Sequence, residues 1–215
     1  MRVVAIDGPA GSGKGTICKK IAELENLVYI DTGILYRCVA YLIIKNGIDI
    51  TDEDRIVELA KNANIDIKKD SVFLNGEDVT TVIREMEVTK IVSNVSSIIK
   101  LREVVVENLR KMAESQDVIM EGRDITTVVL PNANYKFYLD ASVEERANRR
   151  YKENILKGMD VSFNEILENI KARDYNDMHK PVGALMRTDE QIYIDSTNMT
   201  IDEVVSKIRD IIGRE

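Results

Sequence analysis

Short apolar runs rich in β-branched residues alternate along this chain with longer segments in which apolar residues recur every three or four positions. The first pattern predicts buried strands and the second predicts amphipathic helices. Strands that alternate with helices favour a parallel sheet with crossover helices on its faces. The pattern therefore predicts a three-layer α/β/α fold with five parallel strands, at Arg2–Ile6, Leu27–Ile30, Val118–Met120, Tyr135–Leu139 and Gln191–Ile194.

Two helices begin with a recognisable capping signal. Thr200 and Glu203 have the spacing of a capping box, in which each side chain accepts a hydrogen bond from the other residue's backbone N–H. Isoleucine and valine then fall on one helical face, which predicts a helix packed on the core. Ser142 and Glu145 repeat the signal and predict a charged, mostly solvated helix after the fourth strand.

The alternation of strands and helices is interrupted between about Thr51 and Ser93. A helical pattern covers Asp52–Ala63, and the dipeptide Asn75-Gly76 then separates two short runs of strand-forming residues. Asn-Gly readily adopts the positive φ angles of a type I′ turn. The segment therefore predicts a small antiparallel hairpin inserted in the parallel core.

The charge balance limits the classes of partner. The 215 residues include 30 Lys and Arg against 37 Asp and Glu, which gives a formal net charge of −7. Such a balance disfavours a broad basic face for nucleic acid. An anionic ligand would need a local positive site, and we expect no nucleic-acid partner.

Histidine and cysteine are scarce. His179 is the sole histidine, so zinc sites and histidine-dependent nucleophiles have few residues to use. Cys18 and Cys38 are expected to be small buried residues in a reducing compartment. No uncharged stretch approaches the roughly 20 residues of a membrane helix. We therefore expect a cytoplasmic protein with no membrane partner.

A glycine-rich loop between the first strand and the next helix carries the strongest chemical signal. Its residues are Gly8, Pro9, Ala10, Gly11, Ser12, Gly13, Lys14, Gly15 and Thr16. Glycines let backbone N–H groups surround a phosphate, the helix N-terminus adds its dipole, and Lys14 can reach the terminal phosphates. A ligand-free glycine-rich turn is the alternative, but the order of strand, loop, lysine and helix favours phosphate binding.

The loop departs from the usual motif at one position. Ser or Thr normally follows the lysine, but here Gly15 stands there and the hydroxyl is on Thr16. This departure weakens a direct contact between a hydroxyl and magnesium, so no side chain is assigned as a metal ligand. The sequence also has no Asn-Lys-x-Asp run to read guanine, which disfavours a GTPase.

Two further polar runs directly follow predicted strands. Asp31–Arg37 follows the second strand, and Glu121–Asp124 follows the third. Strand ends in an open α/β sheet face the ligand crevice. Charges there either bind magnesium and substrate or pair with each other, as Arg123 and Asp124 could. The first run alone is equally typical of a capped helix with a surface arginine.

These runs together resemble the bacterial cytidylate (CMP) kinases, within the nucleoside monophosphate (NMP) kinases. The resemblance covers nearly the whole chain, and its matching runs lie in Ile6–Thr16, Asp31–Arg37, Glu121–Val129, Leu139–Arg146 and Ile194–Thr197. It implies a P-loop core at residues 1–32, 94–148 and 179–215. It also implies an NMP-binding region with the insert at residues 33–93, and a helical lid at residues 149–178.

The resemblance also implies individual roles. Gly8–Thr16 would hold the phosphates of ATP, and Arg37 and Arg102 would grip the acceptor phosphate. The implied catalytic residues are Lys14, Arg123, Asp124, Arg149, Arg150 and Arg173. The implied substrate-binding residues are Thr32, Tyr36, Arg37, Ser93, Arg102, Arg123, Asp124, Arg173, Asp177 and Lys180. Ser93 and Arg102 lie in a region expected to be helical, Val92–Val106, where the pattern alone would leave them facing solvent.

Two positions depart from the family pattern. Lys180 stands where relatives usually have arginine, which would replace a bidentate phosphate contact by a point charge. Thr126 stands where glycine is usual, which could restrict the approach of the backbone to a ligand. His179 is expected to be an exposed lid residue.

The reaction implied by the resemblance converts ATP and CMP, or dCMP, to ADP and CDP or dCDP, with Mg²⁺ bridging the donor phosphates. The attacking phosphate oxygen is already anionic, so no general base is required. A kinase for a small metabolite such as shikimate, and a nucleotide-binding module without turnover, remain the alternatives. We expect a monomer.

Overall fold

The computed structural model describes residues 1–68 and 71–213. The chain forms two compact units, Met1–Ile30 with Ala113–Glu215, and Asp31–Met112. Each unit has a hydrophobic core of its own. They are called the first unit and the second unit below.

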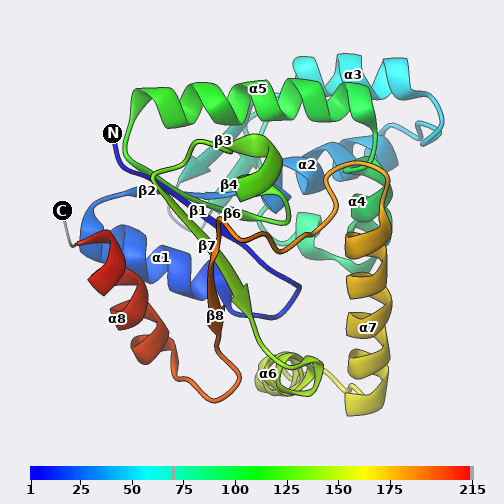
Figure 1. Cartoon of the computed structure of the whole chain (residues 1–215). Helices are drawn as coiled ribbons and strands as arrows, with labels where there is room; N and C mark the ends of the chain where they lie inside the picture. Colours follow the sequence, from blue (N-terminus) through cyan, green and yellow to red (C-terminus); the bar gives the residue numbers. More distant parts are fainter. Residues whose placement is uncertain (69–70, 214–215) are drawn as a thin grey trace. The chain divides into compact units, whose positions relative to one another are not determined.

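A five-stranded sheet forms the centre of the first unit (Figure 1). Its strands, in spatial order, are β2 (Val28–Asp31), β6 (Val118–Gly122), β1 (Val3–Asp7), β7 (Tyr135–Asp140) and β8 (Ile192–Asp195). β1 pairs in parallel with both β6 and β7, and β7 pairs in parallel with β8. The five predicted strands are therefore confirmed, each extended or shifted by one or two residues. After β1 the chain continues to β2 on one side of it, and after β6 it crosses to β7 on the other side. In open sheets with such a change of direction, ligands bind at the carboxyl ends of the strands.

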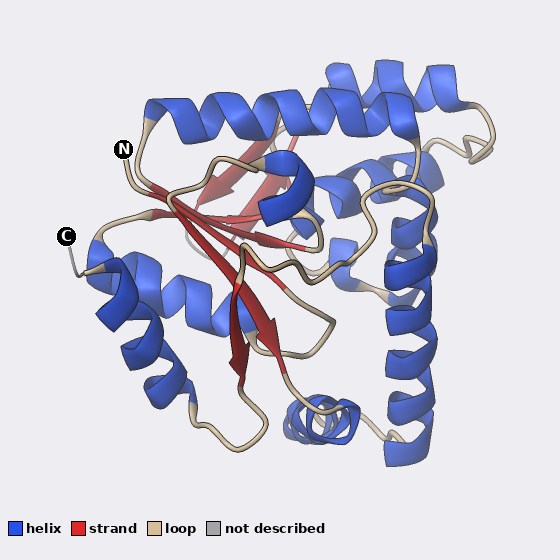
Figure 2. Cartoon of the chain, viewed as in Figure 1, coloured by secondary structure: helices blue, strands red, loops and turns tan. Residues whose placement is uncertain are grey.

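Helices α1 (Lys14–Glu25) and α8 (Ile201–Ile212) cover one face of this sheet, as Figure 2 shows. Their apolar residues join those of the strands in one buried cluster, because each helix has one apolar face. The capping box of α8 is present as predicted: the Glu203 N–H donates to Thr200 Oγ1 at 3.3 Å, and the Thr200 N–H donates to Glu203 Oε2 at 2.7 Å.

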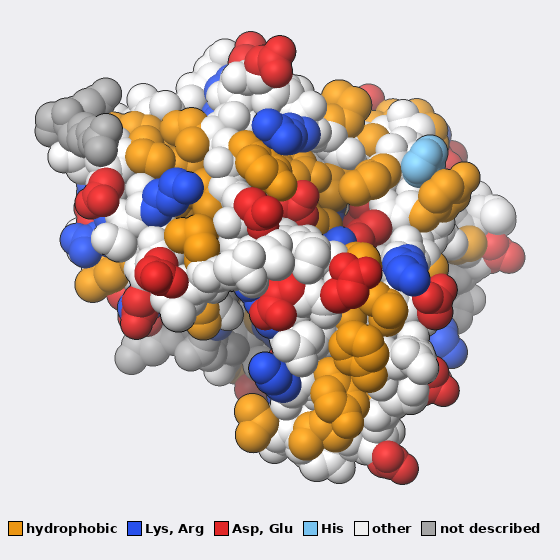
Figure 3. All heavy atoms as spheres, turned by 60° about the horizontal axis from the view of Figure 1, so that its bottom comes forward, with side chains coloured by type: hydrophobic (Ala, Val, Ile, Leu, Met, Phe, Trp, Pro, Cys, Tyr) orange, Lys and Arg blue, Asp and Glu red, His pale blue; other side chains and the backbone are white. Residues whose placement is uncertain are grey.

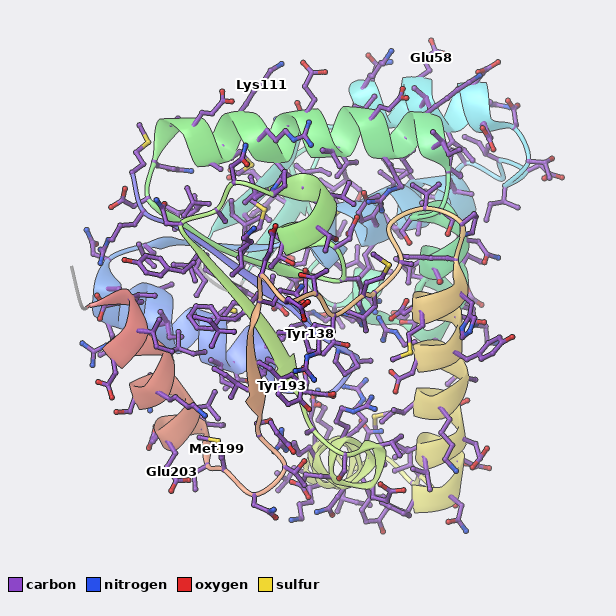
Figure 4. The ribbon with its side chains drawn as sticks, viewed as in Figure 1. Glu58, Lys111, Tyr138, Tyr193, Met199 and Glu203 are labelled. Atoms are coloured by element: carbon purple, nitrogen blue, oxygen red, sulfur yellow. The ribbon has the colours of Figure 1, made fainter. Side chains whose placement is uncertain are left out.

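The other helices of the first unit are α6 (Val143–Leu156) and α7 (Phe163–His179), which pack on each other. Their shared core is small, with Ala147, Ile166 and Ile170 at its centre. A single turn of π-helix, Ile125–Val129, follows β6. On β7 and β8, Tyr138 and Tyr193 lie side by side (Figure 4), with ring centroids 6.2 Å apart.

The second unit contains the insert. Its helices are α2 (Thr32–Lys45), α3 (Glu53–Lys61), α4 (Met86–Val95) and most of α5 (Ile99–Ser115), with a 3-10 turn at Val82–Arg84. Its three-stranded antiparallel sheet consists of β3 (Ile65–Lys68), β4 (Ser71–Leu74) and β5 (Glu77–Asp78). Asn75 and Gly76 join β4 to β5 with φ angles of 53° and 84°, as a type I′ turn requires. The hairpin is confirmed, and a third strand extends it.

The helical region expected at Val92–Val106 is in fact two helices, because α4 ends at Val95 and α5 begins at Ile99. The hydroxyls of Ser96 and Ser97 both donate to the Ser93 carbonyl, at 2.9 and 3.0 Å. Serine side chains that bond to nearby carbonyls compete with the helical backbone ladder. Local capping therefore divides a segment that periodicity alone would join.

The expected states of the two cysteines and of the histidine are confirmed. Cys18 and Cys38 are buried free thiols, and burial raises the pKa of the Cys38 thiol to about 12. His179 is exposed, and the sole imidazole (pale blue) is visible at the surface in Figure 3. On that face acidic and basic side chains are interspersed. None of the helices among residues 1–68 and 71–213 has the length and apolar character needed to cross a membrane.

Candidate functional site

The phosphate loop runs from β1 into α1, and its backbone requires glycine. A Cβ atom on Gly8 would lie 2.0 Å from the carbonyl oxygen of Leu139 on β7, so no side chain fits there. Gly11 and Gly13 have φ angles of 77° and 92°, in the region that favours glycine. The loop thus has the close packing and the left-handed turns that a backbone phosphate cradle needs.

The ammonium of Lys14 lies inside this loop. Its side chain is buried, and Nζ donates to the carbonyl oxygens of Gly8 at 2.7 Å and Pro9 at 2.9 Å. Burial lowers the pKa of Lys14 to about 8, and the positive charge of Arg123 adds to the effect. A phosphate bound in the loop would supply the opposite charge that this ammonium needs.

Two arginines of α6 hold the backbone of the loop. Arg146 Nη1 donates to the Ala10 carbonyl at 3.0 Å, and Arg149 Nη1 donates to the Ser12 carbonyl at 3.3 Å. Arg146 is 5% exposed and pairs through Nη2 with Asp174 of α7 at 2.6 Å. The helix expected to be mostly solvated therefore has one buried face, and Arg146 is a site residue that the sequence analysis missed.

Arg149 and Arg150 differ although they are neighbours. Arg149 Nη2 also donates to the Ser196 carbonyl after β8 at 2.6 Å, so it joins the loop to a second strand end. Arg150 points elsewhere, pairs with Glu153 at 2.9 Å, and has a half-exposed side chain. Within the described residues the structure brings Arg149 to the phosphate loop and leaves Arg150 outside it.

A buried ion pair joins the segment that directly follows β6 to helix α7. Arg123 Nε donates to Asp177 Oδ2 at 2.6 Å, and Arg173 Nε lies 3.9 Å from the same oxygen. Burial alone would raise the pKa of Asp177, but the Arg123 charge outweighs it and the pKa is lowered. For Arg123, burial opposes the charge but Asp177 raises the pKa. The sequence analysis named Asp124 as a possible ion-pair partner of Arg123. The structure shows that Arg123 forms an ion pair with Asp177.

Asp124 and Lys180 belong to the same region of the first unit. Asp124 is buried, and its carbonyl accepts hydrogen bonds from Val128 at 2.9 Å and Val129 at 3.1 Å, which start the π-helical turn. Such turns occur often at functional sites. Lys180 is half-buried just after α7, and its positive charge contributes to the lowered pKa of Asp177.

Thr126, which stands where glycine is usual in the family, takes part in a buried hydrogen-bond network. The carboxylate of Asp7, at the end of β1, accepts hydrogen bonds from the Ile125 N–H at 2.7 Å, the Thr126 N–H at 2.9 Å and the Thr126 hydroxyl at 2.5 Å. Gln191 donates to the same hydroxyl. Burial raises the pKa of Asp7, although the bonds from Thr126 oppose the shift. This network fixes the segment after Asp124 against the strand that begins the phosphate loop.

The remaining predicted residues lie in the second unit. Arg37 Nη1 donates to the Ile83 carbonyl and to Thr89 Oγ1, both at 2.9 Å. Arg102, which the pattern alone would leave facing solvent, is 4% exposed, and its Nη1 donates to the Ser96 carbonyl at 3.1 Å.

Three other predicted residues lie in the second unit. Tyr36 is buried on α2, and the Arg102 guanidinium carbon lies 5.9 Å from the centre of its ring. Thr32 is buried at the first position of α2, where the Asp31 carboxylate caps the helix by accepting from the Gly33 N–H at 2.9 Å. Ser93 is half-buried near the end of α4.

A parallel sheet with a glycine-rich loop between its central strand and the following helix defines the P-loop class of nucleotide-binding proteins. The family model described as cytidylate kinase matches residues 4–214. A cytidylate kinase of Alkaliphilus oremlandii is 48% identical over 205 residues, which cover 95% of this chain and 94% of the relative. A cytidylate kinase of Bacillus subtilis is 43% identical over 216 residues, which cover 99% and 96%. This chain belongs to the cytidylate kinase family.

One solved structure agrees with the fold. An uncharacterised protein from Eubacterium ventriosum superposes with a TM-score of 0.56 at 15% sequence identity, and the match covers 100% of both chains. At this identity the likeness concerns the fold alone.

Proposed function

We propose that this protein transfers the γ-phosphate of ATP to CMP or dCMP, giving ADP and CDP or dCDP in pyrimidine nucleotide metabolism. The observation that carries the proposal is the phosphate loop, with Lys14 inside it, in a chain that belongs to the cytidylate kinase family over residues 4–214. We also propose that the protein is a monomer in the cytoplasm. The proposed parts are a core at residues 1–32, 94–148 and 179–215, an NMP-binding region at 33–93 and a lid at 149–178.

On the donor side, backbone N–H groups of Gly8–Thr16 bind the phosphates of ATP, and Lys14 neutralises the transferred group. Arg149 adds positive charge at the loop, to which it is already bonded through Ser12. Mg²⁺, when bound, neutralises charge on the donor phosphates. Arg150 reaches the reacting phosphate only in a closed lid, because in this structure it pairs with Glu153.

On the acceptor side, Arg37 and Arg102 bind the phosphate of CMP, since planar guanidinium groups match phosphate oxygens. Their anchoring to backbone carbonyls within the second unit supports this role. The residues proposed to contact the sugar or the base are Thr32, Tyr36, Ser93, Asp124, Arg173 and Asp177. Lys180 supplies a point charge, and Arg123 stabilises charge on the transferred group.

Chemistry of this kind needs positioning and charge stabilisation more than proton transfer. The attacking oxygen of CMP is anionic at neutral pH, so the single exposed histidine is no obstacle. Closure of a lid over both substrates would exclude water and suppress hydrolysis of ATP.

The test is a coupled ADP-release assay with ATP and, in turn, CMP, dCMP, UMP, AMP, GMP and shikimate. CMP and dCMP should give the highest kcat/KM. No turnover with any acceptor would contradict the proposal and favour a binding module, and preference for shikimate would favour a metabolite kinase.

A further inference from the structure

The guanidinium of Arg146 is bonded in three directions behind the phosphate loop. Its Nε donates to the carbonyl oxygen of Ala141, just after β7, at 2.9 Å. Its Nη1 donates to the carbonyl oxygen of Ala10 at 3.0 Å, and its Nη2 donates to Asp174 Oδ2 at 2.6 Å. One buried side chain of α6 therefore joins a strand end, the phosphate loop and the neighbouring helix α7 (Figure 1), all within the first unit.

The bond to Ala10 fixes the direction of one peptide group of the loop. The peptide between Ala10 and Gly11 is trans, so its C=O and its N–H point in opposite directions. Because Arg146 holds the Ala10 carbonyl, the Gly11 N–H points away from the guanidinium. A Cβ atom on Gly11 would lie 3.2 Å from Cβ of Arg146, so glycine allows α6 to pack closely against the loop. Arg146 thus sets the direction of a backbone donor in the loop that is proposed to bind phosphate.

Asp174 holds Arg146 from the side of α7. This residue is 9% exposed, and its Oδ1 is buried with no hydrogen-bond partner among residues 1–68 and 71–213. A buried charge needs an opposite charge close by. The bond from Arg146 to Oδ2 therefore compensates the burial of the carboxylate, and the carboxylate in turn fixes the guanidinium.

Stability of the fold alone does not require such a pair. The desolvation of two buried charges costs about as much as their attraction gains, and apolar residues of similar size often replace them without loss. Apolar residues would not, however, provide a donor for the Ala10 carbonyl. The charged pair is therefore explained better by the orientation of the loop than by packing.

We propose that Arg146 is a positioning residue for phosphate transfer. It turns the Ala10–Gly11 peptide so that the Gly11 N–H faces the phosphates of ATP, and Asp174 keeps the guanidinium in this orientation. The pair acts on ATP through the backbone of the loop. The inference rests on the proposed function, and it assigns a role to two residues outside the proposed set of substrate contacts.

The decisive variant separates orientation of the loop from stability. Arg146→Met/Asp174→Leu replaces the buried pair by apolar side chains of similar size, so the melting temperature should stay close to that of the wild type or rise. The Ala10 carbonyl nevertheless loses its donor. Affinity for the non-hydrolysable ATP analogue AMP-PNP, measured by calorimetry, should fall by about 10-fold to 100-fold, because a hydrogen bond to a charged phosphate is weakened or lost. Affinity for CMP should change little.

Single variants show whether the two residues act together. Asp174→Asn keeps the shape of the side chain but removes its charge, and should raise the KM for ATP more than the KM for CMP. Arg146→Met leaves a buried carboxylate without its partner, so it should lower the melting temperature as well. The double variant should lose no more AMP-PNP affinity than Arg146→Met alone, because Asp174 acts through Arg146.

The matched control removes an exposed ion pair from the same helix. Glu168 and Lys171 of α7 are paired at 2.8 Å, and both side chains are exposed. Glu168→Leu/Lys171→Met makes the same kinds of substitution with the same net charge, and both affinities should match those of the wild type.

The outcomes separate this inference from the proposed function. Wild-type affinity for AMP-PNP in a stable double variant would overturn the inference, because the pair would then serve the fold alone. Equal losses for AMP-PNP and CMP would overturn it too, since they would indicate a general distortion. If the double variant does not fold, an unchanged KM for ATP in Asp174→Asn has the same consequence. Failure of the wild type to bind AMP-PNP would instead count against the proposed function.

Discussion

The phosphate loop and the arginines of the second unit are both proposed to donate hydrogen bonds to phosphate, but their donor groups are held in different ways. The loop uses its backbone, and the fit is so close that Gly8 has no room for a Cβ atom beside Leu139. Arg37 and Arg102 use long side chains that reach carbonyl oxygens and the Thr89 hydroxyl. The loop consists of consecutive residues, whereas the two arginines lie far apart in the chain.

This difference has a physical consequence. A backbone cradle is set by local φ angles and by the residues that pack on it, so it exists before a ligand arrives. A guanidinium on a flexible stem must be held by second partners, or it loses rotamer freedom on binding. The carbonyl anchors would therefore hold the arginines in place for the proposed phosphate binding, much as packing holds the loop.

The largest effect is expected at the one side chain that the loop encloses. Lys14→Ala should lower kcat by about 10³-fold, because it removes a buried donor aimed at charge that develops in the transition state. Steady-state kinetics with ATP and CMP give the measurement, and circular dichroism checks that the fold is retained. Lys20→Ala, which removes a more exposed lysine paired with Asp202, is the matched control and should be nearly silent. Activity near the wild-type level in Lys14→Ala would show that the backbone cradle suffices alone.

The next effect concerns the anchored arginines. Arg37→Ala should raise the KM for CMP by about 10-fold to 100-fold, because a hydrogen bond to a charged group contributes about 1.5–3 kcal/mol. The KM for ATP should change little. Thr89→Val keeps the shape but removes the hydroxyl that holds Nη1, and should give a smaller rise that Thr89→Ser restores.

Arg55→Ala, an exposed arginine on α3, is the control for the loss of a positive charge in the same unit. Equal increases of the two KM values in Arg37→Ala would remove this residue from the acceptor side. A silent Thr89→Val would leave Arg37 in place but make the hydroxyl anchor irrelevant.

The same contrast explains what could be predicted from the sequence. The strands and the loop were predictable because β-branched runs and glycine spacing act over a few residues, and the structure places the strands within one or two residues of the expected positions. The α4–α5 break was missed because it depends on hydroxyl contacts of Ser96 and Ser97, which periodicity does not register.

Buried polar residues were harder to predict. Arg146 looked like one more charge on a solvated helix, but its neighbours Ala10 and Asp174 come from elements distant in the chain. Asp7 looked like the end of a strand, and only the fold brings Thr126 and Gln191 to it. The roles of the acceptor-side residues stay predictions carried by the family resemblance.

The dependence of ligand affinity on pH should give the smallest effect, but it distinguishes the phosphate loop from the arginines of the second unit most clearly. Burial lowers the pKa of Lys14 to about 8, whereas arginine stays charged at every practical pH. Phosphate binding favours the charged ammonium, so affinity for AMP-PNP without metal should fall as the pH rises through 8. Above that value the affinity should fall by about tenfold per pH unit, because the lysine must take up a proton for the phosphate to bind.

Affinity for CMP should stay constant over the same range, because the arginines do not titrate and a phosphate monoester with a second pKa of about 6 is already dianionic. Calorimetric titrations of AMP-PNP and CMP at several pH values between about 7 and 9.5 measure both profiles across the Lys14 transition. In Lys14→Ala the AMP-PNP profile should become flat, which separates this lysine from other titrating groups. Parallel profiles for the two ligands would mean that the loop and the arginines respond to a common group, and the contrast between backbone and side-chain recognition would then need another basis.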